Sequence, residues 1–219
     1  SAVLTKLEIP LLVRLKTGQN IREEGPEAHK AKSGTPSMGG LSMIAAVCLV
    51  GLILMRSPDM LVCCASVVCF GFVGFLDDYE KLKKKQNLGL TAKSKFLLQL
   101  VVAIVFIFLL RRLGYLEAHL YIPFWNITVN IPEIVYYVFA AFVIVAEVNA
   151  VNLTDGVDGL ATGTSIPVFL CYAAIAFLWG VRGAGLGVFS SALAGGLLGF
   201  LVYNFNPARI FMGDTGSLF

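Results

Sequence analysis

Residues 60–76 read MLVCCASVVCFGFVGFL, and residues 77–85, which follow directly, read DDYEKLKKK. The first run contains no charged side chain, and its length approaches the roughly 20 apolar residues that a helix needs to cross a bilayer. The second run carries two adjacent acids and then a series of lysines. The junction at Leu76 and Asp77 therefore predicts a membrane-spanning helix that ends at a charged face of the membrane.

Similar apolar runs lie on both sides of this stretch, at about 37–55, 96–110, 134–148, 164–181 and 184–203. A further run at 2–15 is interrupted by charged residues and a proline. The chain is 57% hydrophobic and only 14% charged, with a mean hydropathy of +0.79, which argues against a water-soluble globule and against disorder. We predict an all-α polytopic membrane protein, with about six full transmembrane helices and a partial N-terminal one. Residues 1–219 would form a single integral membrane domain.

The charged residues divide unequally between the two sides of the membrane. The net charge of +3 is too small to indicate a nucleic-acid partner. Alternation across the predicted spans groups segments 14–36, 77–95, 149–163 and 204–219 on one side, and that side carries 12 of the 17 Lys and Arg residues. The positive-inside rule makes this side cytoplasmic. We therefore expect a multi-pass membrane protein whose more basic side faces the cytoplasm.

The far-side segment 111–133 contains Tyr115, Tyr121 and Trp125, followed by the alternating stretch Asn126-Ile-Thr-Val129. Aromatic residues are enriched at membrane interfaces, and alternation of polar and apolar residues is typical of a strand. This pattern predicts a small extracytoplasmic β-hairpin near 120–130.

Asp77 and Asp78 are the first candidate site. At the end of a span they would lie at a helix C-terminus, where the helix dipole disfavours negative charge. Two adjacent, half-buried carboxylates repel each other unless a cation lies between them, and Mg²⁺ prefers carboxylate oxygens and substrate phosphates. The alternative is a solvated pair that closes the helix and is neutralised by nearby lysines.

A second cluster reads NAVNLTDGVDG over residues 149–159. The spacing of three places Asn149, Asn152, Asp155 and Asp158 on one helical face, whereas the two Asp-Gly steps favour a helix that breaks and restarts. Polar residues so close to lipid favour a functional site. The alternative is that Asp155 or Asp158 caps the next helix.

A third cluster reads NFNPARIFMGDTGS over residues 204–217. Asp214 lies between two glycines, which let the backbone approach a ligand closely. Phe211 could stack on a base, although ordinary packing explains it equally well. A fourth segment, 18–40, offers basic residues to an anion, or to lipid headgroups.

These clusters share one membrane face. Carboxylates for a metal, lysines for phosphates and an aromatic ring for a base together suggest phosphoryl transfer from a nucleotide. An ion-coupled transporter with a broken helix is the alternative from another class, although transporter acids usually lie near the bilayer midplane.

In this order, the clusters resemble the bacterial phospho-N-acetylmuramoyl-pentapeptide transferases, within the polyprenyl-phosphate N-acetylhexosamine-1-phosphate transferase superfamily. The resemblance rests on four stretches: GTPSMGG at 34–40, the Asp-Asp-Tyr element within 70–81, NLTDGVDG within 149–161, and FMGDTGS within 203–218. It implies transfer of phospho-MurNAc-pentapeptide from UDP-MurNAc-pentapeptide to undecaprenyl phosphate, which gives lipid I and UMP with Mg²⁺ as cofactor. A sister transferase that uses a UDP-N-acetylhexosamine is the closest alternative.

The resemblance also implies roles for individual residues. Asp77, Asp78 and Asp214 would be the catalytic carboxylates, and Asp214 would bind Mg²⁺. Lys32, Lys81 and Lys95 would neutralise phosphate charge, and Asn204 would donate a hydrogen bond near the metal. The uridine and sugar pocket would be formed by Asn152, Asp155, Asp158 and Phe211.

The family pattern extends beyond this sequence at both ends, through a first span and a histidine-containing loop. The sequence is therefore expected to be part of a longer enzyme. A homodimer is a further expectation.

Overall fold

The computed structural model describes residues 1–15, 34–84, 86 and 88–219, and most of them are helical. The helices are α1 (Ala2–Arg14), α3 (Gly40–Leu54), α4 (Pro58–Lys84), α5 (Ala92–Arg112), α6 (Glu133–Thr154), α7 (Leu160–Leu178), α8 (Ala184–Asn204) and α9 (Gly213–Ser217), and the short 3-10 helix η1 (Gly180–Gly183) precedes α8. Strands β1 (His119–Ile122) and β2 (Ile127–Asn130) complete the fold.

The membrane character predicted from the sequence is confirmed. Helices α4, α5, α6 and α7 are each long and apolar enough to cross a bilayer, and so is the continuous segment Gly180–Asn204. The run at 37–55 forms the shorter apolar helix α3. Many large apolar side chains on these helices are exposed, among them Phe72, Ile104 and Phe142, as expected of surfaces that face lipid.

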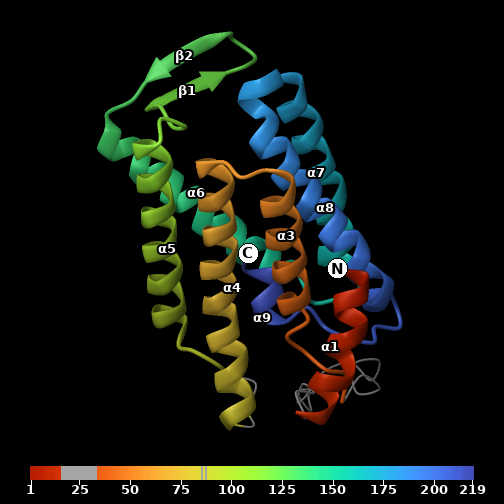
Figure 1. The fold of residues 1–219 in the computed structure, drawn as a ribbon. Coiled ribbons are helices and arrows are strands. Elements are labelled where there is room, and N and C mark those ends of the chain that lie inside the picture. The colour runs from red at the N-terminus through yellow and green to blue at the C-terminus, as the bar shows by residue number, and fades with distance from the viewer. Residues whose placement is uncertain (16–33, 85, 87) are drawn as a thin grey trace.

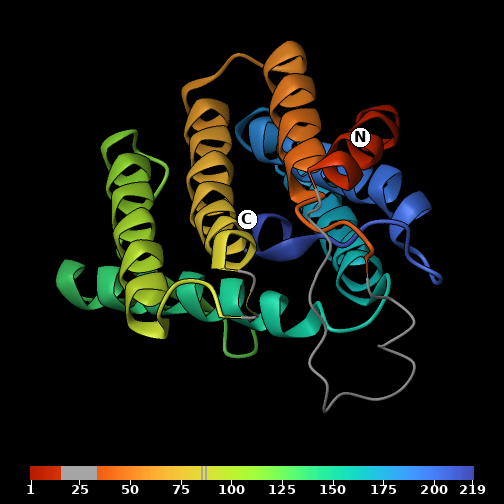
Figure 2. The same cartoon turned by 90° about the horizontal axis from the view of Figure 1, so that it is seen from below.

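The helices form a bundle whose elements are only partly in sequence order (Figure 1). α5, α4 and α3 stand in a row, and α6 slants behind α5 and α4 (Figures 1 and 2). α7 packs along α8, and α8 also contacts α3 and α1. The short helix α9 lies in the middle, against α4 and α3.

The predicted hairpin is also confirmed. β1 and β2 pair antiparallel, with His119 opposite Asn130 and Ile122 opposite Ile127. The hairpin projects at the end of the bundle away from α9 and from the C-terminal end of α4 (Figure 1). Phe124 and Trp125 at its tip are 94% and 71% exposed, which suits an interfacial position.

Close backbone contact places α9 against α4. A side chain at Gly74 would bring its Cβ to 2.0 Å from the carbonyl oxygen of Asp214, so only glycine fits there. Gly213 adopts a positive φ of 70°, which turns the chain into α9. Small residues at such contacts are how helices approach closely in a membrane, where lipid replaces the hydrophobic driving force.

Two local expectations about helix ends need correction. α4 does not end at Asp77 and Asp78 but continues to Lys84, supported by an i,i+4 ion pair between Glu80 and Lys84 at 2.6 Å. The two acids therefore lie inside a helix and not at its C-terminus.

The break after α6 is confirmed, since residues 155–159 separate α6 from α7. However, the N-cap of α7 is Gly159, with a φ of 71° and no side-chain cap, so neither Asp155 nor Asp158 caps that helix.

Candidate active site

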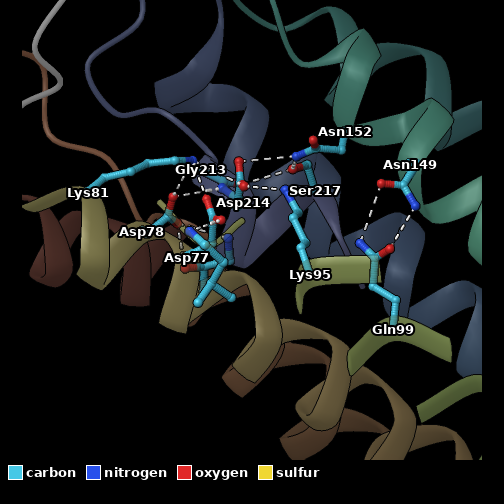
Figure 3. A network of polar contacts seen from close by, with 12 residues as sticks. Asp77, Asp78, Lys81, Lys95, Gln99, Asn149, Asn152, Gly213, Asp214 and Ser217 are labelled. Atoms are coloured by element: carbon cyan, nitrogen blue, oxygen red, sulfur yellow. Dashed lines mark hydrogen bonds and ion pairs between the residues drawn. The ribbon is translucent and has the colours of Figure 1, made fainter. Parts of the chain in front are cut away.

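Asp77, Asp78 and Lys81 project from the same part of α4 (Figure 3). Both carboxylates are buried, at 3% and 4% exposure. Lys81 lies one turn further along the helix and contacts Asp77 Oδ2 at 2.6 Å and Asp78 Oδ1 at 3.6 Å. The other oxygen of Asp77 accepts a hydrogen bond from the backbone N–H of Leu90 at 2.9 Å, which fixes the chain that leads into α5.

Asp78 holds the start of α9. Its Oδ2 accepts hydrogen bonds from the backbone N–H of Thr215 at 2.9 Å and from the Thr215 hydroxyl at 2.7 Å. Its Oδ1 accepts a third from the backbone N–H of Asp214 at 3.2 Å. These contacts satisfy N–H groups that the first turn of a helix leaves without intrahelical partners. Asp78 thus fixes the position of Asp214.

Asp214 is the meeting point of three helices. Its Oδ2 contacts Lys95 Nζ of α5 at 2.5 Å and Lys81 Nζ of α4 at 3.1 Å. Its Oδ1 accepts a hydrogen bond from Asn152 Nδ2 of α6 at 3.2 Å. Asn152 also donates to the Ser217 hydroxyl at 2.7 Å, within α9 itself. Residues far apart in the sequence therefore converge on one carboxylate.

The cluster can hold a divalent cation. One oxygen from each of Asp77, Asp78 and Asp214 lies within 4.8 Å of the others. Three carboxyl groups face two ammonium groups, so the cluster has one excess negative charge when all three acids are ionised. Oxygen donors with excess negative charge are what Mg²⁺ requires, and the site therefore fits that ion.

The charges around Asp214 set its protonation. Burial alone would raise the pKa of Asp214, but the hydrogen bond with Asp77 and the charges of Lys81 and Lys95 outweigh burial and hold that pKa below its ordinary value. Asp214 is therefore ionised at neutral pH, as a metal ligand must be.

Asp155 lies in the break between α6 and α7, and it interacts electrostatically with Asp78 and Asp214 of the carboxylate cluster. Burial, together with the negative charges of Asp214, Asp78 and Asp158, raises the pKa of Asp155 to about 7. Asp158 accepts a hydrogen bond from the backbone N–H of Ala208 at 3.1 Å and so ties this break to the segment that leads toward α9.

Asn204 and Phe211 occupy supporting positions. Asn204 is 2% exposed, and its Oδ1 accepts hydrogen bonds from Thr162 Oγ1 at 2.8 Å and from Gly159 N at 3.2 Å. Its Nδ2 donates to the carbonyl of Ile210 at 3.0 Å. Phe211 is half-buried, and its backbone pairs with Pro36 and Gly39. Lys32 lies outside the described residues.

The structure thus brings Asp77, Asp78, Lys81, Lys95, Asn152 and Asp214 into one contact network. Asp155 and Asp158 lie beside it, while Asn204 braces the segments around it. Sequence reasoning missed Thr215 and Ser217, which lie one and three positions after Asp214. It also missed Gln99, a polar residue isolated in an apolar span, and that isolation is a signal that could have identified it.

Comparisons with known proteins identify the family of this chain. Residues 60–219 match the model of "Glycosyl transferase family 4". A phospho-N-acetylmuramoyl-pentapeptide-transferase of Staphylococcus carnosus is 44% identical over 222 residues, covering 99% of this chain and 68% of the relative. Proteins of the same name from Staphylococcus aureus and Staphylococcus haemolyticus are each 45% identical over 223 residues, with the same coverage. The resemblance drawn from the sequence is confirmed, and the chain belongs to the phospho-N-acetylmuramoyl-pentapeptide-transferase family.

Proposed function

We propose that the protein transfers phospho-MurNAc-pentapeptide from UDP-MurNAc-pentapeptide to undecaprenyl phosphate, producing lipid I and UMP. An oxygen of the lipid phosphate attacks the β-phosphorus of the nucleotide. The bond from that phosphorus to the bridging oxygen breaks, and the electron pair leaves with UMP. The observation that carries this proposal is the convergence of three carboxylates and two lysines at one end of apolar helices.

Such a displacement depends on charge neutralisation and alignment more than on covalent chemistry with the protein. Lys81 and Lys95 already contact Asp214 and lie where they can contact the diphosphate of a bound nucleotide. Mg²⁺ would be held by Asp214 with Asp77 and Asp78 nearby, and would withdraw charge from the phosphate oxygens. Asn152 orients Asp214 from the opposite side.

The two neighbouring acids have different roles in this scheme. Both oxygens of Asp78 are engaged by α9, so Asp78 positions Asp214. Asp77 contacts Lys81 through its Oδ2. The Lys81 side chain is flexible and can move from this oxygen to a phosphate. Asp77 is therefore the carboxylate that accepts a proton from the lipid phosphate or orients it.

The uridine and sugar pocket is assigned to the segments beside the acids. Asp155 and Asp158 in the break after α6, with Phe211 before α9, would receive the nucleoside, and Phe211 would stack on uracil. Lys32 would add positive charge for the diphosphate. Asn204 would act by holding the α7 start and the Ile210 segment in place.

The proposed setting is a bacterial cytoplasmic membrane, with this site on the cytoplasmic side. It is supported by the excess of lysine and arginine in the segments that the alternation of the spans assigns to that side, and by the position of the hairpin at the end of the bundle away from α9. A homodimer stays a prediction, which analytical ultracentrifugation in detergent can check.

The decisive experiment supplies the full-length protein with undecaprenyl phosphate, Mg²⁺ and either UDP-MurNAc-pentapeptide or a UDP-N-acetylhexosamine. Release of UMP with a lipid-linked MurNAc-pentapeptide is expected only with the first nucleotide. Turnover with the hexosamine nucleotide alone would show a sister transferase instead. Asp214→Asn should abolish Mg²⁺-dependent turnover while the protein still elutes as a folded membrane protein, and near-normal turnover would remove Asp214 from the metal site.

A further inference from the structure

Gln99 and Asn149 form a pair of amides between α5 and α6, apart from the carboxylate cluster (Figure 3). Asn149 Nδ2 donates to Gln99 Oε1 at 2.8 Å, and Gln99 Nε2 donates to Asn149 Oδ1 at 3.5 Å. Asn149 Nδ2 also donates to the carbonyl of Val145 at 2.7 Å, within α6. Gln99 has no exposed surface, so its amide depends on this partner.

The same two helices carry the donors that reach Asp214. Lys95 lies one turn before Gln99 on α5 and contacts Asp214 Oδ2 at 2.5 Å. Asn152 lies one turn after Asn149 on α6 and contacts Asp214 Oδ1 at 3.2 Å. The amide pair and Asp214 therefore join α5 to α6 at two adjacent levels.

Next to the amide pair, the contact between α5 and α6 is mainly apolar. Ala103 and Ile107 of α5 pack with Ala141 and Val145 of α6. Apolar surfaces of this kind tolerate small sliding motions, whereas a buried amide pair is satisfied in only one register. At the far end, an exposed ion pair joins Arg111 to Glu133, and such pairs contribute little.

We propose that Gln99 is a positioning residue for phosphoryl transfer, an inference that rests on the proposed function. Through Asn149, Gln99 fixes the register of α5 against α6, so that Lys95 and Asn152 meet the two oxygens of Asp214 simultaneously. A shift of about 1 Å in such a group is enough to lower turnover about 100-fold. Gln99 itself contacts neither substrate nor metal.

Two variants separate positioning from simple stability. Gln99→Leu leaves Asn149 without its partner, so we expect lower thermal stability and a kcat reduced about 10- to 100-fold. Gln99→Leu/Asn149→Leu replaces both amides by apolar groups, which restores stability because no buried polar group is left unpaired. Its kcat should stay low, with KM for the nucleotide within about threefold of the wild type. Recovery of kcat together with stability would overturn the inference.

A double-mutant cycle tests the route through Lys95. In a Lys95→Met background, adding Gln99→Leu/Asn149→Leu should lower kcat by a smaller factor than it does in the wild-type background, because one of the two positioned groups is already gone. A full, additive loss would refute the proposed route. Glu133→Gln, which removes the charge from another polar contact between the same helices, is the matched control and should leave kcat unchanged.

The outcome also distinguishes the two proposals. A folded wild-type protein that forms no lipid I under these conditions refutes the proposed function. A wild-type protein that forms lipid I, with Gln99 variants that match its kcat, refutes only the positioning role.

Discussion

Thr215→Val offers a direct test of how α9 is held at the site. The Thr215 side chain is fully buried, and its hydroxyl donates to Asp78 Oδ2 at 2.7 Å. Valine has nearly the same shape and keeps the branched Cβ, so the substitution removes the hydrogen bond with little change in packing. The backbone N–H of Thr215 remains on the same oxygen at 2.9 Å.

The expected cost follows from the charge of the acceptor. A hydrogen bond to an ionised group contributes roughly 1.5–3 kcal/mol to stability, and the retained backbone donor leaves Asp78 partly satisfied. We therefore expect a loss of about 2 kcal/mol in the free energy of unfolding. Turnover should fall as well, because Thr215 follows Asp214 directly and shares its anchor on Asp78.

Equilibrium unfolding in mixed detergent micelles, with SDS as denaturant, measures this loss. Thr164→Val is the matched control, because the Thr164 hydroxyl donates within its own helix, to the carbonyls of Leu160 at 2.9 Å and Ala161 at 3.2 Å. The control should change stability by no more than about 0.5 kcal/mol. A Thr215→Val protein as stable as this control would show that Asp78 does not depend on the Thr215 hydroxyl and would refute the anchoring of α9 described here.

Further predictions concern the neighbouring groups. Lys95→Met should lower kcat by about 100-fold, because it removes a cation from the proposed phosphate site. Lys93→Met, on the exposed side of α5, should leave kcat unchanged. Similar kcat values for the two variants would exclude a specific role of Lys95. The pKa of Asp155, raised to about 7 in the fold, means that its contribution to stability is present below about pH 4 and is lost as pH rises through 7. The melting temperature of Asp155→Asn minus that of the wild type, measured in EDTA, should therefore increase as the pH is raised from 5 to 8. A difference in melting temperature that does not change with pH would contradict this. Phe211→Ala should weaken UDP binding more than lipid binding in calorimetry, and equal loss of both would indicate misfolding.

The helices and the hairpin could be predicted because membrane structure leaves a strong signal. Length and hydropathy alone are enough to identify residues 60–76 and the other apolar runs as membrane spans. The hairpin followed from alternation at 126–129. Hydropathy does not show where a helix ends once its residues become polar. α4 continues to Lys84 because Glu, Lys and Leu are good helix formers, and the Glu80–Lys84 ion pair adds a small contribution.

The membership of the site could be predicted only in part. The motifs name Asp77, Asp78 and Asp214, yet no spacing rule shows that Asp78 binds the start of α9 while Asp77 contacts Lys81. The contacts of Asp78 with α9 join residues more than 130 positions apart and depend on how closely Gly74 lets α9 approach. Gln99 belongs to none of the recognised motifs, and its role becomes visible only through its hydrogen bond with Asn149 on α6.

Lipid replaces water around most of this chain, and that changes what its polar contacts do. Apolar side chains gain little by moving from lipid to another helix, so apolar packing discriminates weakly between alternative registers. Register must then come from close glycine contacts, such as Gly74 against α9, and from polar pairs, such as Gln99 with Asn149. Each pair contributes only about 1 kcal/mol to folding, but it determines where a catalytic group lies to within a fraction of an ångström. Substitutions at these polar pairs should therefore reduce turnover far more than they reduce the yield of folded protein.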